Sequence, residues 1–205
     1  MKKIPTLFKR ITPDKGKKSL VTNEFNDVQL SQLRATIKWD GTPVMYDGER
    51  WYKRFDLKPG RKLPSDAIPC QSHPDNITGH WPHWVPVLLS DPGDNHISQA
   101  IYNYTHYYAA QIAMGTYEAI GPGINGNPYN LVEDTLRYHG EKILPDIRIN
   151  YEYLYTYLSD NAIEGIVFWN YYEPVCKIKR SDFGFEWPPK MGDRKETHHD
   201  EMAST

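Results

Sequence analysis

The run Lys38-Trp39-Asp40-Gly41 places a lysine at the end of an otherwise apolar strand pattern, directly before an acidic residue and a glycine. A lysine amine can attack an electrophile such as a phosphorus atom only as the neutral base. The pKa of a free lysine side chain is about 10.4, so keeping the amine neutral at pH 7 costs roughly 4–5 kcal/mol. Neighbouring cations and partial burial reduce this cost. We therefore expect Lys38 to act as a nucleophile if the rest of the chain supplies further cations.

Two strand patterns near the carboxyl end carry more charged residues. Side chains alternate between faces along a strand, so Lys177 and Lys179 should share one face of the strand predicted over 175–180. Two such lysines repel each other, but beside a triphosphate they bind its charge and lower the pKa of a neighbouring amine. Glu164 precedes the apolar run 165–169, where an uncompensated carboxylate is costly. A divalent cation would compensate Glu164, and Mg²⁺ prefers such oxygen ligands.

Glu118 and Arg54 are further candidates for nucleotide contacts. Glu118 lies inside the apolar strand pattern 116–120, where its carboxylate could accept hydrogen bonds from ribose hydroxyls. Arg54 shares a strand face with Tyr52, and its guanidinium offers a rigid fork of donors to a phosphate or a ribose edge. For Arg54 and the two strand lysines, the alternative is an ordinary ion pair with Glu118 or Glu164, which contributes little.

In this order along the chain, the charged residues resemble the nucleotidyltransferase motifs I, Ia, III, IV and V of ATP-dependent polynucleotide ligases and capping enzymes. The motif residues are Lys38-Trp39-Asp40-Gly41, Arg54, Glu118 with Gly121, Glu164-Gly165-Ile166-Val167, and Lys177 with Lys179. The chain is most similar to the 5′–3′ RNA ligase family of vertebrates, which has viral and bacterial relatives. Further segments carry this resemblance over roughly residues 32–189: Gly79-His80-Trp81, Trp84-Val85-Pro86, Gly126-Asn127-Pro128-Tyr129, His139-Gly140 and Phe183-Gly184-Phe185 with Trp187-Pro188.

The resemblance implies a role for each motif position around one adenine nucleotide. Lys38 looks like the lysine that forms a phosphoramidate with AMP, and Lys177 and Lys179 look like the lysines on the α-phosphate. The other implied nucleotide contacts are Asp40, Gly41, Arg54 and, at the ribose, Glu118. Glu164 resembles the glutamate of the metal site, so ATP with Mg²⁺ or Mn²⁺ is the implied cofactor set. Tyr129 and Phe168 are candidates for stacking on adenine, although we favour core packing for both.

The function that the resemblance implies is an ATP-dependent RNA ligase. It would join a 5′-phosphate end to a 3′-hydroxyl end of RNA through lysyl-AMP and an adenylated 5′ end. The alternatives are a ligase for nicked DNA or another nicked duplex, an enzyme that only adenylates ends, and a non-catalytic nucleotide- or RNA-binding module. The chain stops soon after the motif V strand, so we expect no C-terminal OB domain, which disfavours a capping enzyme. The basic segments 1–18 and 53–62 are the candidates for binding the polynucleotide.

Length and composition fit one globular domain over residues 1–189, followed by a disordered tail over 190–205. The net charge of −2 does not by itself indicate a nucleic-acid binder. Two cysteines are too few for a disulfide scaffold, and no apolar run reaches the length of a membrane span. A cytoplasmic protein without a membrane segment is therefore expected.

The elements that must position these residues follow from periodicity and turn signals. Residues 34–55 are predicted as a β-meander with Asp47-Gly48 at a hairpin turn. Helices are predicted over 97–114 and 151–158, with a short one over 131–139 capped by Asn130. Strands are predicted over 85–89, 116–120, 163–170 and 175–180. The fold class is α+β with largely antiparallel sheets flanked by helices, and the resemblance implies the nucleotidyltransferase (ligase adenylation-domain) fold.

Cysteine and histidine gather in one Pro- and Trp-rich stretch, which raises the question of a zinc site. The residues are Cys70, His73, His80 and His83. Their spacing does not match a strong zinc pattern, and the neighbouring prolines and tryptophans favour a packed aromatic loop. Cys176 is predicted on the strand face opposite Lys177, as a small core residue.

Overall fold

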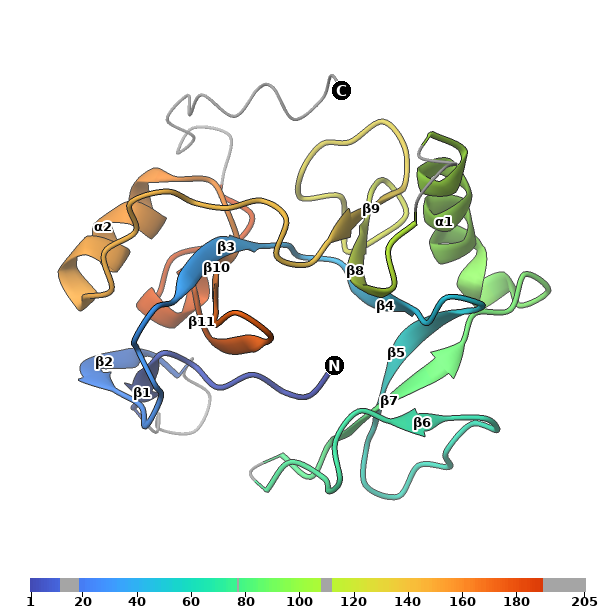
Figure 1. Ribbon diagram of the computed structural model, residues 1–205, viewed down its shortest axis with the longest axis horizontal. Coiled ribbons are helices and arrows are strands. Elements are labelled where there is room, and N and C mark those ends of the chain that lie inside the picture. Colours follow the sequence, from blue (N-terminus) through green and yellow to red (C-terminus); the bar gives the residue numbers. More distant parts are fainter. Residues whose placement is uncertain (12–18, 77, 108–111, 190–205) are drawn as a thin grey trace. The chain divides into compact units, whose positions relative to one another are not determined.

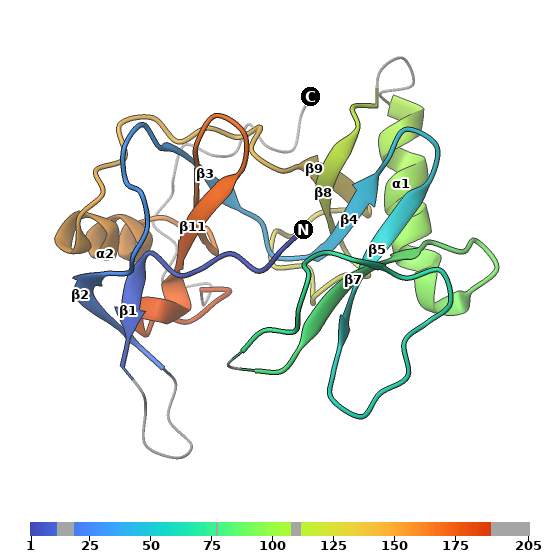
Figure 2. The same ribbon diagram turned by 60° about the horizontal axis from the view of Figure 1, so that its bottom comes forward.

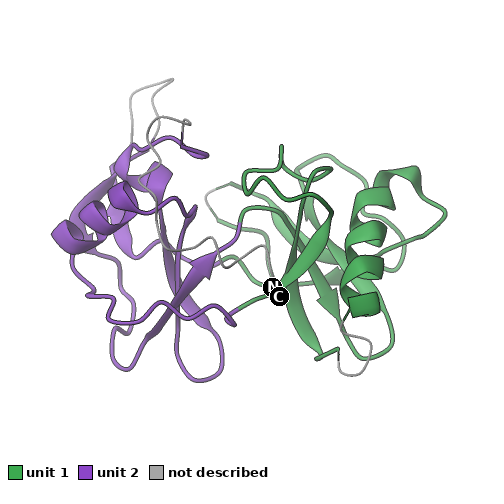
Figure 3. Cartoon of the chain, turned by 90° about the horizontal axis from the view of Figure 1, so that it is seen from above, with its two compact units in different colours: residues 1–3, 40–139 green, residues 4–39, 140–205 purple. Residues whose placement is uncertain are grey.

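A computed structural model describes residues 1–11, 19–76, 78–107 and 112–189, so the predicted tail over 190–205 lies outside the described residues. The described chain is a mixed α+β structure built on antiparallel sheets, as predicted (Figure 1). It divides into two compact units (Figure 3). Unit 1 comprises Met1–Lys3 and Asp40–His139, and unit 2 comprises Ile4–Trp39 and Gly140–Thr205. Among the described helices, none is long and apolar enough to cross a membrane.

Unit 1 contains a six-stranded antiparallel sheet (Figure 2). Its strands, in spatial order, are β6 (Ile68–Pro69), β7 (Trp81–Pro86), β5 (Trp51–Leu57), β4 (Thr42–Tyr46), β8 (Gly115–Ile120) and β9 (Thr135–Tyr138). The short helix η1 (Pro92–Asp94) leads into α1 (Asn95–Tyr107). Helix α1 buries Ile97 and Ala100 against Val44, Tyr117 and Leu136 of the sheet. One face of the sheet is therefore buried under α1, and every second side chain along each strand projects from the opposite face.

Unit 2 contains a three-stranded antiparallel sheet in the order β11 (Pro174–Lys179), β10 (Gly165–Trp169) and β3 (Arg34–Lys38). One face of it is apolar and almost wholly buried, with Ile37, Phe168 and Ile178 at 4%, 0% and 0% exposure. The other described elements of the unit are the hairpin of β1 (Phe8–Arg10) and β2 (Val21–Phe25), helix α2 (Tyr151–Asp160) and the short helix η2 (Arg180–Phe183). The opposite sheet face is therefore the one that can present polar residues.

Local signals predicted several elements well. The Asp47-Gly48 turn does join β4 to β5, and the Asp47 amide donates to the Arg50 carbonyl at 3.2 Å. Helix α2 covers the predicted range and ends two residues later, and Asn150 caps its start by accepting from the Tyr153 amide at 2.8 Å. The final strand pair forms as predicted, as β10 and β11.

Three predictions of secondary structure were wrong. Strand β3 does not belong to a meander with β4, because its described partner strand is β10 in unit 2. Residues 135–138 form β9 rather than part of a helix, since Leu136 is fully buried in the ladder with β8. Asn130 cannot start a helix because its φ of 55° is left-handed, whereas an N-cap residue is extended.

Two further boundaries differ from the prediction. Strand β7 spans Trp81–Pro86 rather than 85–89, because its pairing with β5 starts at Trp81 opposite Leu57. Helix α1 begins at Asn95, two residues before the predicted start, and is described as far as Tyr107. Of the remaining predicted helical positions, 108–111 lie outside the described residues, and 112–114 are not helical.

Candidate active site

The Lys38 motif crosses the boundary between the two units along the chain. Lys38 and Trp39 belong to unit 2, while Asp40 and Gly41 belong to unit 1. Lys38 is the last residue of β3, and its Cα partner on the middle strand is Gly165. Gly165 also pairs with Lys179 on its other side, so the two lysines flank a position without a side chain. A Cβ on Gly165 would lie 2.2 Å from the Ile178 carbonyl oxygen, so only glycine lets the strands approach this closely.

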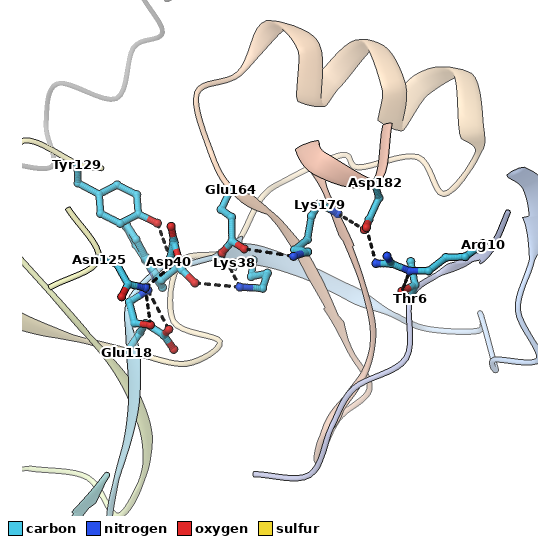
Figure 4. A network of polar contacts seen from close by, with 12 residues as sticks. Thr6, Arg10, Lys38, Asp40, Glu118, Asn125, Tyr129, Glu164, Lys179 and Asp182 are labelled. Atoms are coloured by element: carbon cyan, nitrogen blue, oxygen red, sulfur yellow. Dashed lines mark hydrogen bonds and ion pairs between the residues drawn. The ribbon is translucent and has the colours of Figure 1, made fainter. Parts of the chain in front are cut away.

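Glu164 is the carboxylate that joins these lysines (Figure 4). Its Oε2 lies 2.5 Å from the Lys38 Nζ, and its Oε1 lies 3.9 Å from the Lys179 Nζ. The Lys38 amine also donates to the Trp39 carbonyl at 3.2 Å. The Glu164 side chain is 10% exposed and that of Lys38 is 22% exposed, so water screens this pair only partly. The predicted nucleophile and the predicted metal-site glutamate therefore lie together.

Lys177 lies on the face that carries Lys38, because its Cα partner Val167 is in turn paired with Thr36, two residues before Lys38. Burial lowers the pKa of Lys177 to about 8, and the charges of Lys38 and Lys179 add to this effect. Strand β11 pairs with β10 along one edge, and on its other edge the Lys177 amide donates to the Pro5 carbonyl at 3.0 Å. The prediction that Lys177 and Lys179 share one strand face is thus confirmed.

Sequence reasoning missed a second ion pair behind these lysines. The Asp182 side chain, only 2% exposed, accepts from the Arg10 guanidinium at 2.5 Å and from the Lys179 amide at 2.9 Å. Arg10 also donates from Nε to the Thr6 hydroxyl at 3.1 Å (Figure 4). The one local signal for Asp182 was an acidic residue in the first turn of η2, directly after β11. No local signal pointed to Arg10, which is 172 residues away.

In unit 1, Glu118 lies between two core residues of β8, so its side chain projects from the sheet face opposite α1. Its Oε1 accepts from the Gly41 amide at 3.0 Å, and its Oε2 lies 2.8 Å from Nε2 of His139. A carboxylate oxygen only accepts, so Nε2 of His139 carries the hydrogen, and Nδ1 lies 2.9 Å from the Thr116 hydroxyl oxygen. The sequence did not predict the contact between His139 and Glu118.

Asp40 and Gly41 are held by a loop of unit 1. The Asp40 amide donates to the Tyr129 hydroxyl at 2.6 Å, and the Asn125 side chain donates to Asp40 Oδ1 at 3.1 Å and to the Gly41 carbonyl at 3.0 Å (Figure 4). A Cβ on Gly41 would lie 2.0 Å from the Ala119 carbonyl oxygen, which explains the glycine of the motif sterically. Tyr129 therefore fixes the main chain of the motif through its hydroxyl.

Arg54 projects from the same sheet face as Glu118, with β4 between their strands. Its neighbour Lys53 pairs with the core residue Val44, so Arg54 must point the other way. The Arg54 guanidinium donates to Asp56 Oδ1 at 2.9 Å and to the Met1 carbonyl at 3.3 Å. Arg54 thus forms an ordinary ion pair, but its partner is Asp56 and not Glu118 or Glu164, which the sequence suggested.

The basic segments proposed for binding a polynucleotide contain several lysines and arginines that have carboxylate partners. The pairs are Lys3 with Asp75, Lys9 with Glu24, Arg10 with Asp182, Lys53 with Asp94 and Arg54 with Asp56. Lys53 in particular contacts an Asp94 carboxylate that has no exposed surface. Residues 12–18 of the first segment lie outside the described residues.

Phe168 is fully buried in unit 2, which confirms the interpretation as a core aromatic. Cys176 is fully buried as well, and burial raises the pKa of its thiol to about 12. His83 is 1% exposed, with its ring 4.9 Å from that of Trp81, so the aromatic packing is as expected, but both residues lie in strand β7 rather than in a loop. Across the described residues, no three His, Cys, Asp or Glu side chains gather as a metal site would require. A single carboxylate such as Glu164 would fit Mg²⁺ only together with substrate phosphates, since proteins commonly hold this ion through one or two carboxylates and a phosphate substrate.

No family model matches this chain, and a search of curated proteins also gave no match. The likeness of its motifs to those of polynucleotide ligases therefore remains a resemblance. The candidate site residues are a paired lysine and glutamate with two further lysines in unit 2, and a buried glutamate beside a glycine amide in unit 1.

Proposed function

We propose that this chain is an ATP-dependent RNA ligase with a nucleotidyltransferase fold, and that Lys38 is the residue that becomes adenylated. The observation that carries the proposal is the arrangement in unit 2. Lys38, Lys177 and Lys179 lie on one face of the same sheet, and the Glu164 carboxylate is 2.5 Å from the Lys38 amine. A surface of this kind favours a phosphate group, because the four cations Lys38, Lys177, Lys179 and Arg10 outnumber the carboxylates Glu164 and Asp182 in this partly buried region.

The first step forms a bond between the Lys38 nitrogen and the α-phosphorus of ATP. The bond from that phosphorus to the bridging oxygen breaks, and pyrophosphate leaves with the bonding electrons. The amine must lose a proton before it attacks, and Glu164 Oε2 is its hydrogen-bond acceptor. Lys177 and Lys179 stabilise the negative charge that develops on the phosphate oxygens. A Mg²⁺ ion held by Glu164 would neutralise further phosphate charge when bound.

Two further transfers would complete the sealing of an RNA strand. An oxygen of the RNA 5′-phosphate attacks the phosphorus of lysyl-AMP, which breaks the nitrogen–phosphorus bond and restores Lys38. The 3′-hydroxyl of the other end then attacks the 5′-phosphate, and AMP leaves as the phosphodiester bond forms. The adenylate thus serves first as a carried group and then as the leaving group.

We assign the ribose contact to Glu118 in unit 1. Its carboxylate is fixed by the Gly41 amide and by His139, and these two hydrogen bonds use two of about four acceptor positions. The remaining positions can accept ribose hydroxyls. Asp40, Gly41 and Arg54 are proposed as the other nucleotide contacts, on the strength of the motif resemblance.

The test is incubation of the protein with α-labelled ATP or GTP and Mg²⁺, followed by denaturing electrophoresis. We expect a labelled protein band with ATP, and its complete loss in Lys38→Ala. Lys142→Ala is the matched control, because Lys142 is an exposed lysine of the same unit and should leave the band unchanged. A band that persists in Lys38→Ala, or no band in the unaltered protein, would overturn the proposal.

Labelled 5′-phosphorylated RNA and nicked DNA strands then show which substrate the protein seals. Sealing of RNA is expected, whereas sealing of nicked DNA alone would favour the DNA ligase alternative. Adenylated ends that are never joined would identify an end-adenylating enzyme. Nucleotide binding without any covalent adduct would identify a non-catalytic module.

A further inference from the structure

The turn that joins β10 to β11 carries two consecutive tyrosines with almost wholly exposed side chains. Tyr171 is 89% exposed and Tyr172 is 86% exposed. Their ring centroids are 4.8 Å apart at an interplanar angle of 76°. By contrast, Tyr151 of the same unit packs edge-on against Phe183 at 5.1 Å. Neighbouring exposed aromatic rings on a surface turn indicate a binding surface more than isolated ones do.

The turn is held in one conformation by Asn170. Its Oδ1 accepts from the Tyr172 amide at 2.8 Å and from the Glu173 amide at 2.7 Å. The Asn170 amide donates to the Glu173 carbonyl at 3.1 Å, which closes the turn. Because the backbone that presents the rings is already fixed, binding through them costs less conformational entropy.

The sheet that leads to this turn is basic on one face. Residues directly opposite each other on paired strands share a face, so the register places Arg34, Lys38, Lys177 and Lys179 together. Arg34 is exposed, and its Cα partner is Trp169, the last residue of β10 before the turn. Basic side chains along one surface with aromatic rings at its end are the pattern that binds single-stranded nucleic acid.

We propose that Tyr171 and Tyr172, with Arg34, form a stacking surface for the bases of an RNA strand whose end lies at Lys38. This inference rests on the proposed function and names where the RNA is bound. A protein partner would not require the cations of this sheet face, with Arg34 next to the turn and Lys38, Lys177 and Lys179 further along it, whereas the phosphates of a nucleic acid do. In Figure 2 the turn is the orange loop above the label β11.

The geometry also gives the length of RNA that can reach the tyrosines. Gly165 pairs with Lys38, and Trp169 lies four residues further along β10. This span is about 13 Å at roughly 3.3 Å per residue. A stacked strand advances about 3.4 Å per nucleotide, so the rings meet bases roughly four to five nucleotides from the end.

The experiment compares the full chain with its double variant Tyr171→Ala/Tyr172→Ala. Fluorescence anisotropy measures binding of a labelled, 5′-phosphorylated, single-stranded RNA of about ten nucleotides, and lysyl-AMP formation is measured in parallel. We expect the Kd for this RNA to rise about tenfold or more in the double variant, with lysyl-AMP formation unchanged. Tyr171→Phe/Tyr172→Phe should keep the original affinity, because the rings remain. An RNA of about three nucleotides should bind both proteins equally.

The matched control is Tyr102→Ala/Tyr107→Ala on α1, whose side chains are 62% and 70% exposed. It should leave RNA affinity unchanged. Equal RNA affinity of the Tyr171/Tyr172 alanine variant and the unaltered chain would overturn the inference, and so would a loss of affinity in the phenylalanine variant. If the unaltered protein forms no lysyl-AMP while the alanine variant still loses RNA affinity, the ligase proposal fails and the stacking surface stands.

Discussion

The Lys38 amine and the Glu164 carboxylate form an ion pair with a nitrogen–oxygen distance of 2.5 Å, although 126 residues separate them in the sequence. Glu164 also lies 3.9 Å from the Lys179 amine, so one carboxylate compensates more than one lysine. The pair is partly buried, and in such pairs the removal of one partner leaves an uncompensated charge. This relationship makes Glu164 important both for the stability of unit 2 and for the proposed chemistry.

Replacing Glu164 should therefore affect both properties. We expect Glu164→Gln to lower the free energy of unfolding by about 1–3 kcal/mol, because Lys38 and its neighbouring lysines then repel each other without compensation. Lysyl-AMP formation should be lost as well. Urea unfolding measures the first effect and α-labelled ATP the second. The control is Glu24→Gln, which breaks the exposed pair with Lys9 in the same unit and should change little. Equal effects of the two variants would contradict this prediction.

Lys177 predicts a pH dependence of stability. Its folded pKa of about 8 lies below the ordinary value of 10.5, chiefly because of burial. Below pH 8, Lys177 is protonated in both the folded and the unfolded chain, so the buried charge destabilises the folded state fully. Between these two pKa values the unfolded chain binds more protons than the folded one, so this contribution to stability rises with pH and is complete above 10.5.

The variant Lys177→Met removes that cost. We expect this variant to have a free energy of unfolding at pH 7 that is higher by as much as about 3 kcal/mol. Between pH 8 and pH 10, its free energy of unfolding should increase less steeply with pH than that of the unaltered protein. Urea unfolding at several pH values measures both quantities. Lys142→Met is the control, because that side chain is exposed. A less stable Lys177→Met protein at pH 7 would show that the charge of Lys177 is well compensated in the folded state.

Gly41 should tolerate no side chain. A Cβ there would lie 2.0 Å from the Ala119 carbonyl oxygen and 2.8 Å from the Ile120 side chain, so β4 and β8 would have to separate. We expect Gly41→Ala to lower the free energy of unfolding by roughly 2–3 kcal/mol or more. Gly60→Ala is the control: its φ of 75° costs about 1–2 kcal/mol, but its Cβ would meet no atom within 4 Å. Equal losses in the two variants would contradict the steric explanation.

Asp182 should position Lys179 for catalysis. The carboxylate accepts the Lys179 amide at 2.9 Å and the Arg10 guanidinium at 2.5 Å. We expect Asp182→Ala to slow lysyl-AMP formation by about tenfold at saturating ATP, because a misplaced lysine stabilises the transition state less well. Asp182→Asn keeps an oxygen for the Lys179 amide and should restore part of the rate. If both variants lose stability equally but keep the normal rate, Asp182 is structural only.

Much of the local arrangement could be predicted from the sequence. The alternation of residues 175–180 separated Lys177 and Lys179 from the core residues Cys176 and Ile178, and both of the latter are fully buried. The Asp47-Gly48 turn and helix α2 also follow from local signals. Each of these features depends on residues within a few positions of each other, so local backbone preferences and the burial pattern are sufficient.

The arrangement of the candidate site required the tertiary structure. The sequence by itself determined which residues carry the charges, their order along the chain and the strand faces they occupy. Only the tertiary structure decided that β3 pairs with β10 rather than β4, that residues 135–138 form a strand, and that Arg10 meets Asp182. A strand's alternation defines its apolar face but not the strand that satisfies its backbone hydrogen bonds, because pairing and burial over long sequence separations set that choice.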